Sequence, residues 1–117
     1  MKTSSAKAKG RELQKWVCQQ ISKITGLDWG YEDEKLIQPR IMGQKGKDVV
    51  LRGDALKFKF DVECKRTEKF NLYEAIEQAK SNTEEGRFWM VVHKKNRYEP
   101  IVVLDAKDFF EMYGGNI

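Results

Sequence analysis

The chain has 117 residues, of which 40% are hydrophobic and 34% charged, and it carries a formal net charge of +4. These values are typical of one globular domain over residues 1–117 and exclude a wholly disordered chain. No apolar run approaches the roughly 20 residues of a membrane-spanning helix, and the basic N-terminal stretch lacks the apolar core of a signal peptide. The sequence therefore predicts an intracellular, cytoplasmic protein with no membrane partner, and it leaves open a cellular or phage origin.

The first predicted element is a helix from about Ser5 to Thr25, which Gly26 ends. Its apolar residues recur at intervals of three and four, as on the buried face of a helix. The predicted stripe consists of Leu13, Trp16, Val17, Ile21 and Ile24. Residues 1–26 also carry six Lys/Arg against one acid, Glu12, whereas the rest of the chain carries sixteen against seventeen. Such a segment attracts phosphates without reading sequence, although a solvated helix face has the same composition.

The next part of the chain predicts a loop and three strands. Residues 27–47 hold an acidic cluster, a short candidate strand at 35–38 and a loop with Pro39, Gly43 and Gly46. Residues 48–53, "DVVLRG", are typical of a short buried strand, and the "GDA" after it predicts a turn to an antiparallel neighbour. That neighbour is "KFKFDVECK", residues 57–65, in which apolar and charged side chains alternate strictly.

The second half predicts a helix, two strands and a final helix. "FNLYEAIEQAKSNTEEG" has Asn71 as N-cap, Glu74 to complete a capping box, and Gly86 as its end. Its predicted core stripe is Leu72, Ala75, Ile76 and Ala79. "RFWMVVHKK" and "IVVLD" are short, apolar and rich in β-branched residues, which favours strands. A last helix begins after Asp105, with an apolar stripe of Phe109, Met112 and Tyr113 and an end at Gly114.

The predicted order of elements is α, β, β, β, α, β, β, α. A helix between two strands indicates a crossover connection, and the preceding hairpin indicates antiparallel pairing. We therefore expect an α/β or α+β fold with one mixed sheet flanked by helices.

Cysteine and histidine restrict the metals that the chain can hold. Cys18 and Cys64 have no CxxC spacing, and His93 is the only histidine, which excludes a Cys/His zinc site. Cys18 lies beside apolar positions of the first helix and Cys64 lies on the apolar face of the strand, so both are expected to be small buried thiols. Any metal would be held by oxygen.

Two carboxylates and an amine form the candidate site. The predicted turn would place Asp48 beside Glu63, and such a pair suits Mg²⁺, with the backbone carbonyl of Cys64 as a further ligand. Lys65 lies on the same strand face as Glu63, where an ammonium can hold a metal-bound water or neutralise charge on a phosphate. An exposed strand face that pairs its own charges has the same pattern, so the motif alone leaves both readings open.

A family resemblance adds to these residues. "GKDVVL" and "FDVECKR", with fourteen residues between Asp48 and Glu63, resemble the D-x(n)-E-x-K signature of the PD-(D/E)XK nuclease superfamily. The predicted order of elements resembles its α-β-β-β-α-β core, a restriction-endonuclease-like fold. The opening "AKAKGRELQKWV" is similar to the first helix of archaeal-type Holliday junction resolvases. The resemblance covers roughly residues 7–104.

The resemblance implies a role for each matching residue. Asp48 and Glu63 would bind Mg²⁺, for which Mn²⁺ would substitute, Lys65 would position or activate the attacking water, and Glu12 would complete the acidic site. DNA contacts are expected from Lys7, Lys9, Arg11, Lys45, Lys47 and Arg66.

The sequence departs from the pattern at two places. Lys47 stands where a proline often precedes the aspartate of the family. Gln78 is a candidate for a glutamine that many relatives carry on the second helix, but Asn82 stands where their tyrosine would be. A surface position on the helix explains Gln78 better than a role in the site.

The expected function is that of a Mg²⁺-dependent endonuclease that resolves four-way (Holliday) junctions in DNA recombination or repair. A homodimer is implied by the resemblance, because two strands of like polarity must be cut. Two alternatives stay open: a nuclease of the same fold that acts on duplex ends, nicks or single strands, and a non-catalytic nucleic-acid-binding module.

Overall fold

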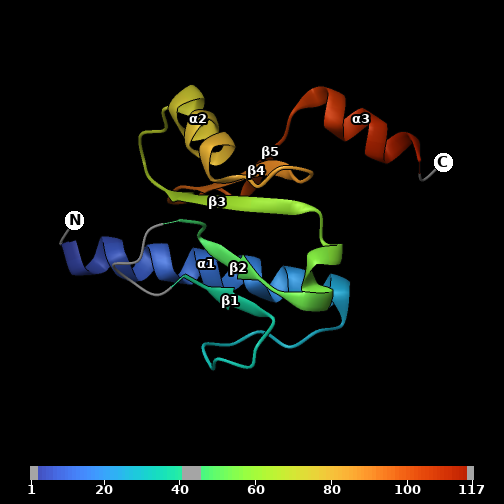
Figure 1. The fold of residues 1–117 in the computed structure, drawn as a ribbon. Coiled ribbons are helices and arrows are strands. Elements are labelled where there is room, and N and C mark those ends of the chain that lie inside the picture. The colour runs from blue at the N-terminus through green and yellow to red at the C-terminus, as the bar shows by residue number, and fades with distance from the viewer. Residues whose placement is uncertain (1–2, 41–45, 116–117) are drawn as a thin grey trace.

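Three helices and five strands follow one another in the predicted order in the computed structural model, which describes residues 3–40 and 46–115 (Figure 1). A 3₁₀ helix, η1, is added between the second and third strands. The elements are α1 (Thr3–Thr25), β1 (Ile37–Pro39), β2 (Val49–Leu51), η1 (Gly53–Lys57), β3 (Phe60–Arg66), α2 (Leu72–Asn82), β4 (Phe88–Lys94), β5 (Ile101–Val103) and α3 (Ala106–Gly114).

The strands form two sheets, where the sequence predicted one. β1 and β2 make an antiparallel pair, and β3, β4 and β5 make a mixed sheet in which β4 is central. β3 and β4 run parallel, as the crossover through α2 predicts, and β5 is antiparallel to β4. The class is therefore α+β with a mixed sheet of three strands.

The predicted hairpin between β2 and β3 is wrong. β2 pairs with β1, and η1 occupies the segment expected to form the turn and the start of the long strand, so that β3 begins at Phe60 instead of Lys57. The side chain of Arg87 holds this segment in place, because it donates to the carbonyl oxygens of Leu56, Phe58 and Phe60 and so satisfies backbone acceptors outside the sheet.

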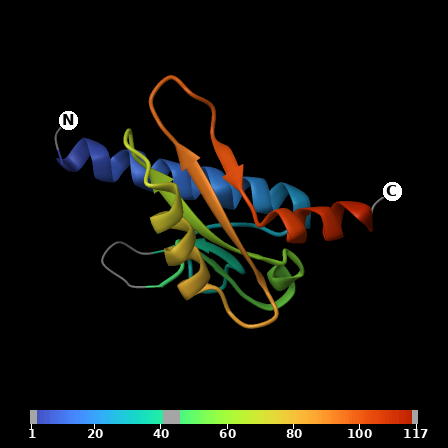
Figure 2. The ribbon, with the colours of Figure 1, turned by 90° about the horizontal axis from the view of Figure 1, so that it is seen from above.

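The larger sheet separates two layers (Figures 1 and 2). α1 and the β1–β2 pair lie against one face, and α2 covers the other. The α1 side holds the main core, in which the buried members are Leu13, Val17, Cys18, Ile21, Ile37, Val49, Ala55, Val62 and Val92. Ala75, Ala79 and Val91 form a smaller core under α2. The alternation in β3 thus sends Val62 towards α1 and leaves Asp61 and Glu63 on the α2 side.

The helix predictions hold in part. Gly26 ends α1 with a φ of 75°, and Asn71 caps α2 by accepting the backbone N–H of Glu74 at 3.1 Å. In the predicted stripe of α1, Trp16 and Ile24 are exposed, and Cys18 is buried in their place. α2 ends at Asn82, four residues before the predicted stop.

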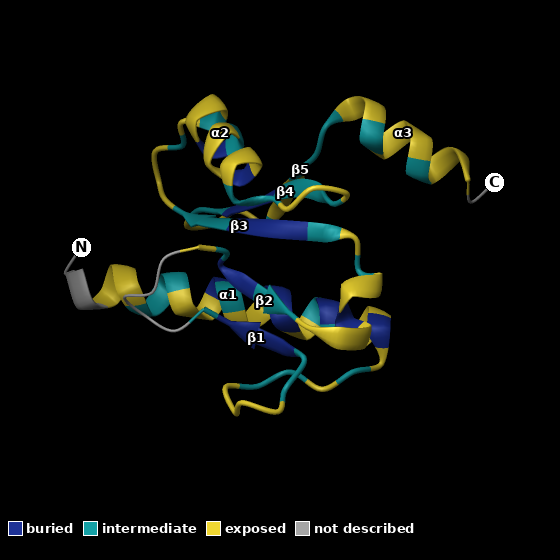
Figure 3. Ribbon diagram, viewed as in Figure 1, coloured by how far each residue is buried: buried dark blue, intermediate teal, exposed yellow. Residues whose placement is uncertain are grey.

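α3 stands apart from the two cores (Figure 3). None of its residues is buried, and Phe109 and Tyr113 of its predicted stripe are exposed. Across residues 3–40 and 46–115, no helix is both long and apolar enough to cross a membrane.

Candidate active site

Asp48 lies just before β2 and is almost completely buried. Its Oδ2 accepts the backbone N–H of Cys64 at 2.6 Å, and its Oδ1 lies 2.9 Å from Nη2 of Arg40 and 3.3 Å from Nε2 of Gln14. β3 is an edge strand, so an N–H on its free edge needs a partner outside the sheet. The Asp48 carboxylate supplies that partner and holds the start of β2 against β3.

Glu63 is the second carboxylate of the site, on the α2 side of β3. Its Oε1 lies 3.8 Å from Nζ of Lys65, and its Oε2 accepts from Nδ2 of Asn82 at 3.4 Å. Burial, together with the nearby carboxylate of Asp48, raises the pKa of Glu63 to about 7, although Lys65 and Asn82 act in the opposite direction. The structure thus brings Asp48, Glu63 and Lys65 together as predicted, with two acids close enough to disfavour a second charge.

The chemistry of these two carboxylates suits Mg²⁺. Mg²⁺ commonly takes one or two carboxylates and keeps water as its other ligands, and two mutually repelling carboxylates favour a cation between them. Within the described ranges, no group of three or more His, Cys, Asp or Glu residues is placed to hold a metal. The Cys64 carbonyl as a further ligand remains a prediction.

Two pockets are lined by residues that contact the carboxylates. One, of about 480 Å³, is lined by Arg40 and Asn82, the partners of Asp48 and Glu63, and by Lys47 and Glu84. The other, of about 150 Å³, has Lys65 on its wall. The exposed Gln78 lies on the wall of this second pocket, so the structure places it near the lysine of the motif.

Lys47 is held in ion pairs, which differs from the predicted free contact to phosphate. Its Nζ lies 2.8 Å from Oε1 of Glu84 and 3.3 Å from Oδ2 of Asp61. Asp61 is buried on the Glu63 side of β3, where it also binds Nε of Arg87 at 2.9 Å and the backbone N–H of Glu84 at 3.0 Å. Asp61 thereby fixes the segment after α2, which is a structural role.

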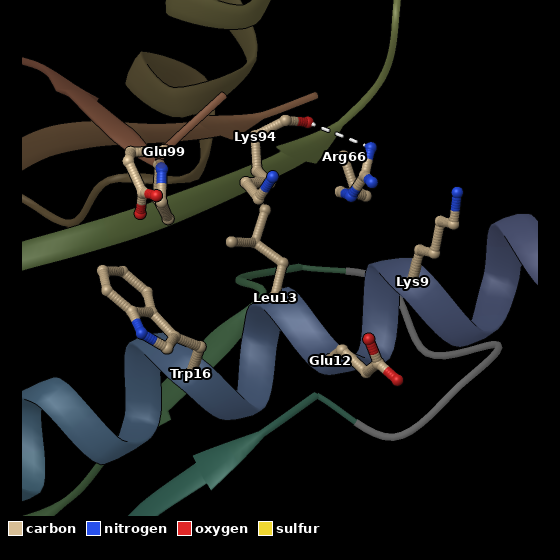
Figure 4. A pocket seen from close by; sticks show the side chains of 8 residues that line it. Lys9, Glu12, Leu13, Trp16, Arg66, Lys94 and Glu99 are labelled. Carbon is tan, nitrogen blue, oxygen red and sulfur yellow. Dashed lines mark hydrogen bonds between the residues drawn. The ribbon is translucent and has the colours of Figure 1, made fainter. Parts of the chain in front are cut away.

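Glu12 does not join Asp48 and Glu63 in this structure. It is exposed on the face of α1 that carries Leu13 and Trp16, and Figure 4 shows its carboxylate pointing away from Arg66. Gln14 reaches Asp48 instead. Two residues along a helix correspond to a rotation of roughly 200°, so both side chains cannot face the same site.

The other predicted DNA contacts lie on or near α1. Lys7 and Arg11 are exposed, and Lys9 lies on the wall of a different pocket from the one that Arg40 lines. Arg66 follows Lys65 but belongs to the opposite face of β3, where it binds Oε2 of Glu68 at 3.0 Å. Lys45 lies outside the described residues.

Sequence reasoning missed Gln14, Arg40 and Asn82. Gln14 and Asn82 each contact a carboxylate that is distant in the chain, at separations of 34 and 19 residues, whereas Arg40 contacts Asp48 across the loop that follows β1. Asn82 had a weak signal, because it stands four residues after Gln78 on the helix that follows the motif. Gln14 and Arg40 had none, since neither lies in a motif or at a distinctive spacing.

Comparison of the chain with protein-family models, with curated proteins and with solved structures found no match. The functional interpretation therefore depends on the geometry of the site and on the motif resemblance.

Proposed function

We propose that this protein is a Mg²⁺-dependent endonuclease with a restriction-endonuclease-like fold, and that it cuts branched DNA such as four-way junctions. The observation that carries the proposal is the buried pair of Asp48 and Glu63, with the ammonium of Lys65 3.8 Å from Glu63. Pockets lined by Lys65 and by the partners of the two acids, Arg40 and Asn82, would give a phosphate and a nucleophile a route towards this pair. Two acids and one amine are sufficient for phosphodiester hydrolysis with a metal.

Each residue has a chemical task in this proposal. The carboxylates of Asp48 and Glu63 would hold the metal, which supplies positive charge for the phosphate and lowers the pKa of a bound water. Lys65 would hold that water or stabilise the negative charge that develops on the phosphate. Arg40, which follows β1, keeps the carboxylate of Asp48 in place, and Asn82, at the end of α2, keeps that of Glu63 in place.

The fold supports the family proposal through the order of its elements. α1, three strands, α2 and β4 follow the α-β-β-β-α-β order of the superfamily. β2 and β3 form no ladder here, and the bond from Cys64 N–H to Asp48 joins them at the site. The motif residues therefore lie where the two strands separate.

The substrate and the assembly are inferred from size and symmetry. A single domain of this length has little surface for reading base edges, and phosphate contacts position DNA without recognising its sequence. Cutting two strands of like polarity requires two sites, so we infer a symmetric homodimer. Exposed apolar residues on β5 and α3 offer a surface for the second copy: Ile101, Val102 and Phe110.

The deciding experiment compares substrates and variants. A four-way junction, a linear duplex, a nicked duplex and a single strand are incubated with and without Mg²⁺, and paired symmetric nicks confined to the junction are expected. Asp48→Asn, Glu63→Gln and Lys65→Met should each lower the cleavage rate by about 100-fold or more, while junction binding in EDTA changes little. Glu77→Gln, an exposed carboxylate on α2, is the matched control and should cleave normally.

Other outcomes identify the alternatives. Cleavage of ends, nicks or single strands without cleavage of the junction would indicate a nuclease that acts on a different substrate. Normal Mg²⁺-dependent cleavage by Asp48→Asn and Glu63→Gln would show that these residues do not form the active site.

A non-catalytic binding module is the second candidate, and one contact favours it. The guanidinium of Arg40 lies 2.9 Å from Asp48, so the protein itself supplies a cation to this carboxylate. Absence of cleavage on every substrate with Mg²⁺ and with Mn²⁺ would support this reading.

A further inference from the structure

A second cleft, of about 380 Å³, lies between α1 and the ends of β3 and β4 (Figure 4). It is on the opposite side of β3 from Glu63, because Arg66 on its wall and Glu63 belong to different faces of the strand. Leu13 lies in this cleft, whereas the next residue, Gln14, contacts Asp48. The cleft is therefore distinct from the candidate active site, and the mechanism proposed above does not use it, although Lys9 and Arg66 were expected to contact DNA.

One end of the cleft is cationic. Nζ of Lys9 and Nη2 of Arg66 both donate to Oδ1 of Asn96, at 3.0 and 2.7 Å. Lys94 adjoins them, and its carbonyl accepts from Nη1 of Arg66 at 3.4 Å. Two cations are therefore near neighbours around one neutral oxygen, while Glu68 binds Arg66 and Glu12 also lines the cleft. Such an arrangement suits an anion with several acceptor oxygens, of which a phosphate is the commonest in biology.

The other end is aromatic. Trp16 is 39% exposed, although it belongs to the apolar stripe of α1. Pro100 lines the same cleft. Glu99 faces Trp16 across the cleft (Figure 4). A carboxylate at this end disfavours a second phosphate but accepts hydrogen bonds from amino groups. An indole face that remains open to solvent is a platform on which a base can stack.

We propose that this cleft binds one unpaired nucleotide, with the base against Trp16 and the phosphate among Lys9, Arg66 and Lys94. The volume lies within the range of small-molecule sites, roughly 300–1,000 Å³. A base inside a duplex is stacked on both faces and paired at its edge, so only a single-stranded or extruded nucleotide can enter. Glu99 can accept from the amino groups of guanine, adenine and cytosine, and thymine has none.

The proposal rests on the proposed function only in taking DNA as the partner. A free mononucleotide carries the same base and phosphate, and the two sources are separated by measurement. The probes are short fluorescein-labelled single strands of dC and of dT, a matched duplex, deoxycytidine monophosphate and inorganic phosphate. All titrations are made in EDTA, so that cleavage plays no part.

The expected result is a binding pattern that depends on both ends of the cleft. The dC strand should bind more tightly than the dT strand, and Trp16→Leu should weaken single-strand binding by about tenfold while duplex binding changes less than about threefold. Lys9→Gln combined with Lys94→Gln should weaken the same probe and reduce the salt dependence of its binding. Glu99→Gln should reduce the preference for dC. Lys23→Gln, on an exposed part of α1 away from the cleft, is the matched charge control.

Each remaining outcome is informative. Equal loss of duplex and single-strand binding in Trp16→Leu, or an unchanged affinity for the single strand, would overturn the proposal. If the mononucleotide competes at a concentration close to that of the strand, the site binds free nucleotides. If inorganic phosphate alone competes equally well, the cleft is a simple anion site and the proposed role of Trp16 is wrong. If the protein cleaves no substrate but its single-strand binding requires Trp16, the nucleotide site is supported and the proposed nuclease activity is refuted.

Discussion

At the scale of the residue, Glu63 is the acid of the site whose pKa departs clearly from its ordinary value. Burial and the Asp48 carboxylate raise its pKa to about 7, so the folded chain binds this proton more tightly than the unfolded chain does. The stabilisation from the protonated form is complete below the ordinary pKa of a glutamate and is lost as the pH rises through about 7. A divalent cation between the two acids would replace the proton.

We predict that Glu63→Gln removes this part of the pH dependence. The unfolding free energy of the wild type should fall by roughly 2–3 kcal/mol more than that of the variant between pH 4.5 and pH 8. Urea titrations at several pH values measure the difference, with Glu77→Gln as the control. Equal slopes in wild type and Glu63→Gln would contradict the raised pKa.

The same pair gives a metal test that needs no cleavage. Mg²⁺ or Mn²⁺ at pH 7.5 should raise the melting temperature of the wild type, because a ligand that binds only the folded state stabilises it. Asp48→Asn and Glu63→Gln should lose most of this increase. An equal increase in all three proteins would place the cation elsewhere.

At the scale of the element, Arg87 organises the start of β3 and the end of α2. Its side chain is only 10% exposed, and it joins Asp61 to the carbonyls of Leu56, Phe58 and Phe60. Without it, a buried carboxylate keeps Lys47 and one backbone N–H as partners. Loss of one partner of a buried ion pair leaves charge and backbone acceptors unsatisfied.

We therefore expect Arg87→Ala to destabilise the protein by about 3 kcal/mol in urea denaturation. Arg87→Lys should recover only part of this, because an ammonium lacks the planar fork that reaches several acceptors. Lys57→Ala, an exposed basic residue in η1, is the control and should cost less than about 0.5 kcal/mol. A loss below about 1 kcal/mol for Arg87→Ala would show that β3 does not depend on this network.

At the scale of the whole molecule, α3 contributes apolar surface without contributing to the core. None of its residues is buried, and Phe110 is 70% exposed. The interior of a homodimer interface is richer in apolar residues than the rest of a surface. The proposed second copy would cover this surface together with the exposed side of β5.

We predict that Phe110→Ser leaves the stability of the single chain within about 0.5 kcal/mol and weakens self-association by about tenfold or more. Sedimentation equilibrium over a range of concentrations measures the association. Tyr73→Ser, which alters an exposed aromatic residue on α2, should change neither quantity. Unchanged association in Phe110→Ser would exclude this surface as the interface.

The sequence by itself determined the features that depend on neighbouring residues. The alternation around Asp61, Val62 and Glu63, the cap at Asn71 and the order of the elements all follow from periods of two or about 3.6 residues and from local hydrogen bonds. The approach of Asp48 to Glu63 was also predicted, although the hairpin expected to cause it is not formed.

Only the tertiary structure decided which partners those elements choose. β2 pairs with β1 instead of β3, and the rotation of α1 brings Gln14 to Asp48 while it leaves Glu12 at the second cleft. Such outcomes depend on competition among packing arrangements between distant segments, which no local period encodes. The proximity of Asp48 and Glu63 could therefore be predicted from the sequence, whereas the groups that surround them could not.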